Sequence, residues 1–235
     1  LVHGGGKEVT DTAFKLGKEQ NFVISPGGVK SRYTDKETAE IYTMVMAGKI
    51  NKVIVKMFLE QGIKAVGISG IDGGLMRASR KKRLLILNDK GRKMAIEGGF
   101  TGKISGVDPL LLNIIANNGF LPIVSPVAFS DEFDFLNVDG DRAAANIAAG
   151  IGANKVIFLT NVEGLILDHS IVSHMSLAEA KAIIPSIGFG MEKKVLACTE
   201  ALEMGVEEAI IGSGKVAAPV SAALNHLNCT VISKT

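Results

Sequence analysis

The chain has 235 residues, of which 47% are hydrophobic and 21% charged, as is ordinary for a globular enzyme that buries its own core. The net charge of +2 does not by itself indicate a nucleic-acid-binding surface, and no apolar run is long enough to span a bilayer. Cys198 and Cys229 stand in apolar patterns, which favours buried, reduced thiols in a cytoplasmic protein over disulfides or catalytic groups.

Apolar, β-branched runs alternate with helical patterns along the chain. This alternation predicts an α/β fold with a mostly parallel, doubly wound sheet, which binds ligands outside the carboxyl ends of its strands. We expect two lobes, residues 1–149 and 150–235, on one continuous sheet. The expected strands are 64–69, 84–87, 121–124, 155–160, 208–211 and 230–232, and the expected helices are 7–16, 34–47, 50–61, 109–117, 141–151, 177–183, 191–204 and 217–227.

The chain opens on a short apolar segment followed by His3 and the glycines Gly4, Gly5 and Gly6. Glycine lets backbone approach a ligand closely, and the free N–H groups of the helix that follows would point at it. Phosphate is the expected ligand, and a tight strand-to-helix turn is the alternative. A buried strand does not normally open a protein, so we expect a further segment upstream.

A second loop, residues 27–35, carries Arg32 just before a helix that Thr34 or Asp35 would cap. The planar fork of an arginine suits a carboxylate. A solvated loop, with the arginine paired to a neighbouring acid, is the alternative.

Polar residues then stand at alternate positions, at Asn137, Asp139 and Asp141. In extended chain they share one face, and Asp141 can cap the alanine-rich helix that follows. Such a cluster can position a substrate amine, cations or metal-bound phosphates. An Asx-rich turn is the alternative.

Two segments of the C-terminal half resemble nucleotide-binding loops. Asn161 to Gly164 follows a strand, as such loops do. Gly190 and Met191 precede a helix with Lys194 in its first turn, where a cation is slightly unfavourable with the helix dipole and so indicates a nearby phosphate. An exposed lysine is the alternative. No pair of the four histidines has metal-ligand spacing.

Residues 73–102 interrupt the alternation of strands and helices. Their apolar residues alternate with polar ones, and residues 88–91 carry a turn signal, so the segment predicts an inserted β-hairpin. The segment is strongly basic. Its cations could dock an acidic partner, or they could be a solvated edge that discourages aggregation. They are Arg77, Arg80, Lys81, Lys82 and Arg83, followed by Lys90, Arg92 and Lys93.

Taken in order, these motifs resemble the amino acid kinase family over essentially the whole chain. The resemblance implies a three-layer αβα sandwich with a mostly parallel central sheet. The matching segments are His3 to Gly6, the Arg32 loop, residues 67–73, residues 137–141, residues 161–164, and Gly190-Met191 with Lys194.

Within the family, residues 27–38 are most similar to kinases that act on 2-aminoadipate or glutamate linked to a small acidic amino-group carrier protein of the LysW type. The resemblance implies transfer of the ATP γ-phosphoryl group to the side-chain carboxylate, with Mg²⁺ arriving with ATP, in lysine and in some cases arginine biosynthesis. It also implies a homodimer formed through the substrate lobe. The alternatives are an N-acetylglutamate kinase and a binding module without turnover.

The resemblance also assigns roles to individual residues. Gly5 and Gly6 stabilise the moving phosphoryl group, Lys194 neutralises phosphate charge, and Asp141 orients that lysine. Substrate binding falls to Gly28, Arg32, Asn137 and Asp139. The nucleotide is bordered by Asn161, Gly164, Gly190, Met191, Gly212 and Gly214, and the carrier docks on Arg77, Arg80, Lys81, Lys82 and Arg83.

Three features depart from the family pattern. The family has an earlier strand ending in Lys-x-Gly-Gly, whose lysine contacts the transferred group, and this chain begins after it. Asn161 stands where the family commonly has Asp. Asp139 stands where acetylglutamate kinases often have Asn, which counts against acetylglutamate as the substrate.

Overall fold

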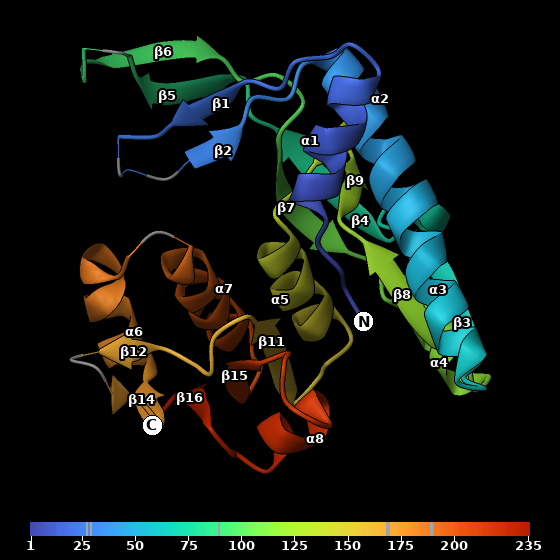
Figure 1. The fold of residues 1–235 in the computed structure, drawn as a ribbon, viewed down its shortest axis with the longest axis vertical. Coiled ribbons are helices and arrows are strands. Elements are labelled where there is room, and N and C mark those ends of the chain that lie inside the picture. Colours follow the sequence, from blue (N-terminus) through green and yellow to red (C-terminus); the bar gives the residue numbers. More distant parts are fainter. Residues whose placement is uncertain (27, 29, 89, 168–169, 189) are drawn as a thin grey trace. The chain divides into compact units, whose positions relative to one another are not determined.

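The computed structural model describes residues 1–26, 28, 30–88, 90–167, 170–188 and 190–235. The chain forms two compact units, Leu1–Ala143 and Ala144–Thr235 (Figure 1). Helix α5 (Gly140–Gly150) begins in the first unit and ends in the second, and the expected division at residues 149 and 150 falls inside it. A sheet continuous through both units stays a prediction.

The first unit is built on a parallel pair of strands, β3 (Ala65–Ser69) and β8 (Leu121–Ser125). Residues at the start of the chain extend this pair, because Val2 forms a parallel bridge with Val124 on the other side of β8. Ile123 and Val124 are fully or almost fully buried, as expected of a strand covered on both faces. The glycines at positions 4–6 therefore follow directly from a strand position.

The helices of the first unit are α1 (Gly6–Lys15), α2 (Lys36–Thr43), η1 (Met44–Ile50), α3 (Asn51–Glu60) and α4 (Leu110–Asn117). Asp35 caps α2 by accepting a hydrogen bond from the Thr38 backbone N–H (2.8 Å). The expected break near residues 47–50 is wrong. Backbone dihedrals stay helical through Met44 and Asn51, so α2, η1 and α3 form one continuous helix in which η1 is a π-helical turn (Figure 1).

A second sheet of the first unit has the order β10-β9-β4-β7. Its strands were not expected from the sequence, because they are short or half-exposed and carry no long apolar run. They are β4 (Met76–Arg80), β7 (Gly102–Val107), β9 (Val127–Phe129) and β10 (Phe135–Asn137), with a short 3₁₀ turn, η2 (Asp72–Gly74), before β4.

Two antiparallel hairpins complete the first unit. The expected hairpin is confirmed as β5 (Arg83–Leu87) paired with β6 (Lys93–Glu97), although residue 89 of its turn lies outside the described residues. A second hairpin pairs β1 (Phe22–Ile24) with β2 (Lys30–Arg32). Strands β1 and β5 are in contact, and the two hairpins lie side by side in Figure 1.

The second unit contains a four-stranded sheet of order β11-β15-β16-β14, built from β11 (Lys155–Thr160), β15 (Glu208–Ser213), β16 (Cys229–Ser233) and β14 (His174–Ser176). Two of its three pairings are parallel, and β15 with β16 is antiparallel. A small antiparallel pair, β12 (Ile166–Leu167) and β13 (Ser170–Ile171), lies apart from it in the sheet pairing.

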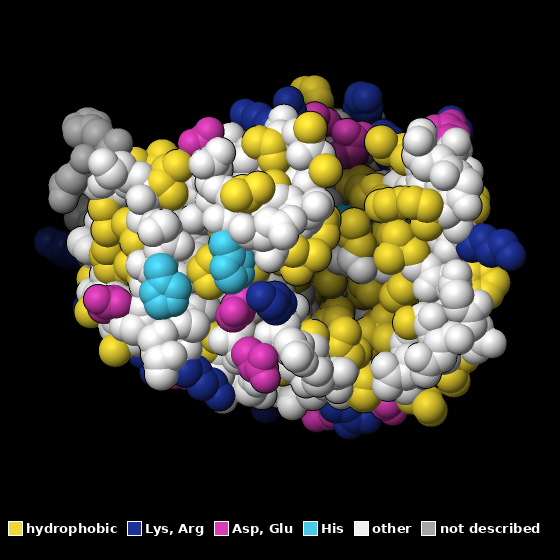
Figure 2. All heavy atoms as spheres, turned by 90° about the horizontal axis from the view of Figure 1, so that it is seen from below, with side chains coloured by type: hydrophobic (Ala, Val, Ile, Leu, Met, Phe, Trp, Pro, Cys, Tyr) yellow, Lys and Arg dark blue, Asp and Glu magenta, His cyan; other side chains and the backbone are white. Residues whose placement is uncertain are grey.

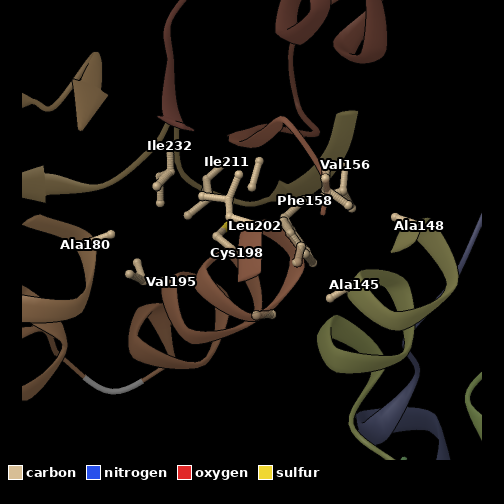
Figure 3. Close-up of a cluster of buried hydrophobic side chains, with 14 of the residues drawn as sticks. Ala145, Ala148, Val156, Phe158, Ala180, Val195, Cys198, Leu202, Ile211 and Ile232 are labelled. Atoms are coloured by element: carbon tan, nitrogen blue, oxygen red, sulfur yellow. The ribbon is translucent and has the colours of Figure 1, made fainter. Parts of the chain in front are cut away.

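The helices of the second unit are α6 (Leu177–Ile183), η3 (Ile184–Ser186), α7 (Met191–Glu203) and α8 (Pro219–Leu224). Ser176 and Glu179 form a capping box at the start of α6. Apolar side chains from α7, β11 and β15 point toward one another in one buried cluster (Figure 3). Cys198 is part of this cluster and Cys229 is also buried, in agreement with the sequence. Among the described residues, no helix is long and apolar enough to cross a membrane.

Candidate functional site

The glycine loop of the first unit joins the strand position at Val2 to helix α1. The His3 backbone N–H donates to the Val124 carbonyl (3.2 Å), and the chain enters α1 at Gly6 with Gly5 as its N-cap. A Cβ on Gly5 would lie 2.1 Å from Cδ1 of Ile50, so only glycine fits there without a shift of the neighbour. The first N–H groups of α1 thus open onto a loop of bare backbone, the arrangement that suits a phosphate.

Arg32 reaches the same loop. Its Nη2 atom donates to the Gly6 carbonyl oxygen (2.8 Å) and to Oγ1 of Thr10 (2.9 Å), and its Nη1 atom donates to Gln20. The guanidinium also stacks over the Phe22 ring, 5.1 Å from its centroid. Partial burial lowers the pKa of Arg32, and the named acceptors are all neutral groups, so a carboxylate is the complement that this side chain suits.

Phe100, which follows the β5–β6 hairpin, connects the Arg32 loop to Asn137 through hydrogen bonds. The Asn137 amide donates to Oγ1 of the fully buried Thr34 (3.1 Å), and its backbone N–H donates to the Phe100 carbonyl (2.9 Å). The Phe100 N–H donates in turn to the Thr34 carbonyl (2.6 Å). Asn137 and the Arg32 loop are therefore held together by one set of hydrogen bonds.

Asp139 is the N-cap of α5. Its Oδ1 atom accepts from the backbone N–H groups of Asp141 and Arg142, both at 3.1 Å. The expectation that Asp141 caps this helix is wrong, because Asp141 already lies in its first turn. Beneath this turn, the Tyr42 hydroxyl donates to the Pro126 carbonyl (3.2 Å), and burial followed by the charge of Asp139 raises its pKa. No sequence motif includes Tyr42.

In the second unit, several predicted nucleotide-binding residues gather where β11 and β15 end. Asn161 follows β11, and Gly214 follows β15 and donates its N–H to the Thr160 carbonyl (2.7 Å). Helix α7 leads into β15 through a short turn, so the two run in opposite directions and the N-terminus of α7 lies at the same edge. That edge carries Gly190 with φ +95°, Met191 and Lys194, and Gly212 lies inside β15. Bare glycine backbone beside a helix N-terminus and a lysine fits a nucleotide phosphate.

Two predicted glycines have a local reason to be glycine. A Cβ on Gly164 would lie 2.6 Å from Oγ1 of the fully buried Thr230, which also accepts from the Leu165 N–H (2.8 Å). Gly28 has φ +83° and donates to the Ser25 carbonyl (2.9 Å) in the connection between β1 and β2, whose residues 27 and 29 are outside the described residues. Gly164 is thus required by packing and Gly28 by turn geometry.

Two of the predicted docking cations have partners inside the first unit. Arg77 pairs with Asp131 (2.8 Å) and lies over the Phe129 ring. Arg80 donates to the Gly99 carbonyl (2.6 Å), pairs with Glu97 (3.1 Å), and lies 4.1 Å from the Phe100 ring centroid.

The other predicted docking cations differ in exposure. Lys81 is partly buried; desolvation and then the charge of Arg142 lower its pKa, while Asp139 acts in the opposite direction. Lys81 therefore lies near the start of α5 and is a site neighbour that spacing alone did not reveal. Lys82 and Arg83 are exposed, as are Lys90, Arg92 and Lys93 nearer the hairpin tip.

A model of the amino acid kinase family matches residues 1–213. The chain belongs to this family. The match includes every candidate site residue except Gly214, and it confirms the resemblance read from the motifs.

Two named relatives match nearly the whole chain. A [LysW]-aminoadipate/[LysW]-glutamate kinase of Metallosphaera sedula is 43% identical over 225 residues, which are 95% of this chain and 86% of the relative. A protein of Cenarchaeum symbiosum is 61% identical over 232 residues, 99% of this chain and 87% of its own length, and carries the same name as a provisional assignment.

Solved structures of amino acid kinase fold support the architecture alone, since their sequences are distant. Carbamate kinase of Giardia lamblia bound to AMP-PNP aligns with a TM-score of 0.68 and 15% identity, covering 100% of this chain and 84% of that one. N-acetylglutamate synthase of Neisseria gonorrhoeae aligns with a TM-score of 0.78 and 20% identity, over 100% of this chain and 51% of that one. The predicted α/β fold is confirmed.

Proposed function

We propose that this amino acid kinase transfers the γ-phosphoryl group of ATP to the side-chain carboxylate of 2-aminoadipate or glutamate whose amino group is linked to a small acidic carrier protein of the LysW type. The product is an acyl phosphate of lysine or arginine biosynthesis. Identity with named [LysW]-aminoadipate/[LysW]-glutamate kinases over nearly the whole chain supports this proposal. The geometric observation that carries it is the bond between Arg32 and Gly6, which joins a carboxylate-binding side chain to a phosphate-binding loop.

The reaction needs alignment more than proton transfer. A side-chain carboxylate is already ionised at neutral pH, so no general base is required to make it a nucleophile. In this proposal the amides of Gly5 and Gly6 stabilise the transferring group, and Arg32, Asn137 and Asp139 hold the acid substrate, with Gly28 shaping the loop beside it. Charge neutralisation by preorganised donors supplies most of the rate enhancement of such transfers.

Nucleotide binding is assigned to the second unit. Asn161, Gly164, Gly212 and Gly214 border the nucleotide, Gly190 and Met191 lead into α7, and Lys194 neutralises phosphate charge. Asp141, in the first turn of α5, keeps the catalytic role that the resemblance implies.

Magnesium is proposed to arrive with ATP. Among the described residues there is no group of three or more His, Cys, Asp or Glu side chains that could hold a metal ion. Mg²⁺ typically keeps several waters and binds one or two carboxylates together with substrate phosphates, and it supplies charge neutralisation when bound.

The carrier is proposed to dock on exposed cations of the β5–β6 hairpin. Arg77 and Arg80 are held by Asp131, Glu97 and ring faces, so they are poor candidates for a partner's charge. Lys82 and Arg83, together with Lys90, Arg92 and Lys93, present exposed positive charge instead. Such a surface attracts an acidic protein and sets its orientation.

A homodimer through the first unit is the proposed assembly. Helix α4 contains no charged residue, yet Leu110 and Ile114 are exposed at 63% and 51%. An uncharged apolar stripe suits a second copy of the chain better than an acidic carrier. Figure 2 shows hydrophobic side chains exposed on one face of the molecule. Sedimentation equilibrium of the purified protein measures the assembly directly.

Trapping the acyl phosphate as a hydroxamate tests the function. The purified protein is incubated with ATP, Mg²⁺ and hydroxylamine, and with glutamate on its carrier, aminoadipate on its carrier, or free N-acetylglutamate. We expect hydroxamate with a carrier-linked acid and little with N-acetylglutamate. Hydroxamate with N-acetylglutamate alone would identify an acetylglutamate kinase, and nucleotide binding without any hydroxamate would identify a binding module.

A further inference from the structure

We propose that Asn51 and the π-helical turn η1 are positioning elements for the glycine loop. They set the loop's shape through His3 and Gly5 without touching substrate themselves. The inference deepens the proposed function, because it concerns the loop assigned to the transferring phosphoryl group. No motif of the sequence analysis includes Asn51.

Asn51 is a fully buried polar residue at the start of α3. Its Nδ2 atom donates to the carbonyls of Ile123 in β8 (2.9 Å) and Ile68 in β3 (3.2 Å) and lies 3.3 Å from Nε2 of His3. A Cβ on Gly67 would lie 1.9 Å from Oδ1 of Asn51, so the strand is shaped around this side chain. One amide therefore joins a helix, two parallel strands and the residue before the glycines.

His3 connects Asn51 to the glycine loop. It is 93% buried, and its Nδ1 atom lies 3.0 Å from the Gly4 carbonyl oxygen. A carbonyl can only accept, so Nδ1 carries the proton, and Nε2 accepts an Asn51 hydrogen that is shared with one of the two carbonyls. Both ring nitrogens thus have a fixed role, and burial lowers the pKa of His3, which favours this neutral form.

The π-helical turn supplies the second contact with the loop. A Cβ at position 5 would lie 2.1 Å from Cδ1 of Ile50 and 2.8 Å from Sδ of Met46, both in η1, so these side chains would have to move to admit it. A π-helical turn contains one residue more than an α-helical turn, and each residue turns an α-helix by about 100°. The register of η1 therefore decides both that Ile50 faces Gly5 and that Asn51 faces His3.

A double-mutant cycle separates this role from general stability. The variants are His3→Leu, Asn51→Asp and the double variant, assayed by hydroxamate formation with the carrier-linked acid. Misplacing a reacting group by about 1 Å can cost on the order of 100-fold in rate. We expect kcat to fall about 10- to 100-fold in each single variant while KM for ATP changes by less than about threefold. The double variant should fall no further than the worse single variant, because His3 acts on the loop through the contact that it shares with Asn51.

His3→Gln is the rescue variant, since its amide reaches the position of Nε2, and it should recover part of kcat over His3→Leu. An unchanged kcat in His3→Leu, or losses that multiply in the double variant, would overturn the proposal. If Asn51→Asp does not fold, the His3→Leu and His3→Gln pair still decides it.

The helical register of η1, which decides which of its residues face the glycine loop, is tested by removing one residue from η1. Deletion of Gly48, which is exposed, should convert η1 to α-helix, shift Ile50 relative to Gly5 and lower kcat, whereas Gly48→Ala keeps the chain length and has open space for its Cβ. We expect Gly48→Ala to keep full kcat.

The ¹H–¹⁵N signals of Gly4, Gly5 and Gly6 provide a readout independent of catalysis. They should move in His3→Leu and in the Gly48 deletion, and stay in place in Gly48→Ala. If the protein proves inactive with every acid, these signals still test the positioning role. Unmoved signals in His3→Leu would refute it.

Discussion

Nη2 of Arg32 lies 2.8 Å from the carbonyl oxygen of Gly6, although 26 residues separate them in the chain. The bond joins the hairpin β1–β2 to the first turn of α1. A carboxylate that binds Arg32 is therefore placed at the mouth of the glycine loop. In the proposed function, one guanidinium would therefore set both the substrate position and the loop position.

Arg32→Lys should impair catalysis more than it impairs folding. An ammonium group is a point charge and cannot reproduce the planar fork that reaches Gly6, Thr10 and Gln20 together. A hydrogen bond to a charged group is worth about 1.5–3 kcal/mol, so kcat/KM for the acid should fall about 10- to 100-fold. Steady-state kinetics measure the fall. Thr10→Ser keeps the hydroxyl acceptor and is the matched control, and equal losses in both variants would contradict the assignment.

Asp139 has a capping role that can be separated from a substrate role. Asp139→Ala removes the acceptor for the Asp141 and Arg142 N–H groups and should lower the free energy of unfolding by about 1 kcal/mol. Asp139→Asn keeps the cap and should cost only a few tenths of that. Urea unfolding compares the two. If the charge also binds substrate, both variants lose kcat/KM; normal kinetics in Asp139→Asn would exclude the charge from binding.

Gly164→Ala should destabilise the second unit. The new Cβ would meet Oγ1 of Thr230 at 2.6 Å, and Thr230 is fully buried and bonded to the Leu165 N–H, so it has little room to move. Overpacking of this kind costs about 1–3 kcal/mol. Thermal and urea unfolding followed by circular dichroism give the loss. Gly106→Ala, with open space around its Cβ, should stay within about 0.5 kcal/mol of the parent.

Neutralising exposed hairpin cations should weaken use of the carrier-linked acid. Replacement of Lys90, Arg92 and Lys93 by Gln should raise KM and reduce the salt dependence of kcat/KM, because long-range attraction is screened by salt. Lys56→Gln with Lys64→Gln removes exposed charge elsewhere on the unit and serves as the control. Activity that is insensitive to both sets would place the carrier on another surface.

Glu208 should contribute stability only above acidic pH. A hydrogen bond from Lys155 (2.6 Å), reinforced by His226, lowers the pKa of Glu208 below its unfolded value of about 4.3. A lowered folded pKa gives stability that is present above that unfolded value and is lost as pH falls through the folded pKa. The side chain is partly exposed, so the contribution is at most about 1 kcal/mol. The free energy of unfolding from pH 7 to pH 3 should fall further in the parent than in Glu208→Gln.

The main α/β elements could be predicted because their sequence patterns are local. The runs at 155–160 and 177–183 match β11 and α6 residue for residue. The continuous helix through η1 could not, because Gly48 and Lys49 resemble a helix end, and tertiary packing overrides that preference. Strands β4 and β7 were not expected, since half-exposed strands that carry basic residues have a weak hydrophobic pattern.

The candidate site was predictable in its residue types but not in its contacts. Glycine before a helix and a lysine in a first turn are local signals of a phosphate. Whether Arg80 is free to meet a partner depends on Glu97 and Phe100, which only the folded hairpin brings near. Asn51 had a faint signal, a polar residue within an apolar helical pattern, but its partners come from β3, β8 and the start of the chain.

The contact between Gly5 and Ile50 makes two distant positions share one small volume. A larger residue at position 5 requires the side chain at position 50 to move or to become smaller, so the fitness effect of either change depends on the residue at the other. Substitutions that look forbidden one at a time can therefore become permitted in pairs. The requirement for glycine at position 5 therefore comes from the neighbouring side chains as well as from the loop itself.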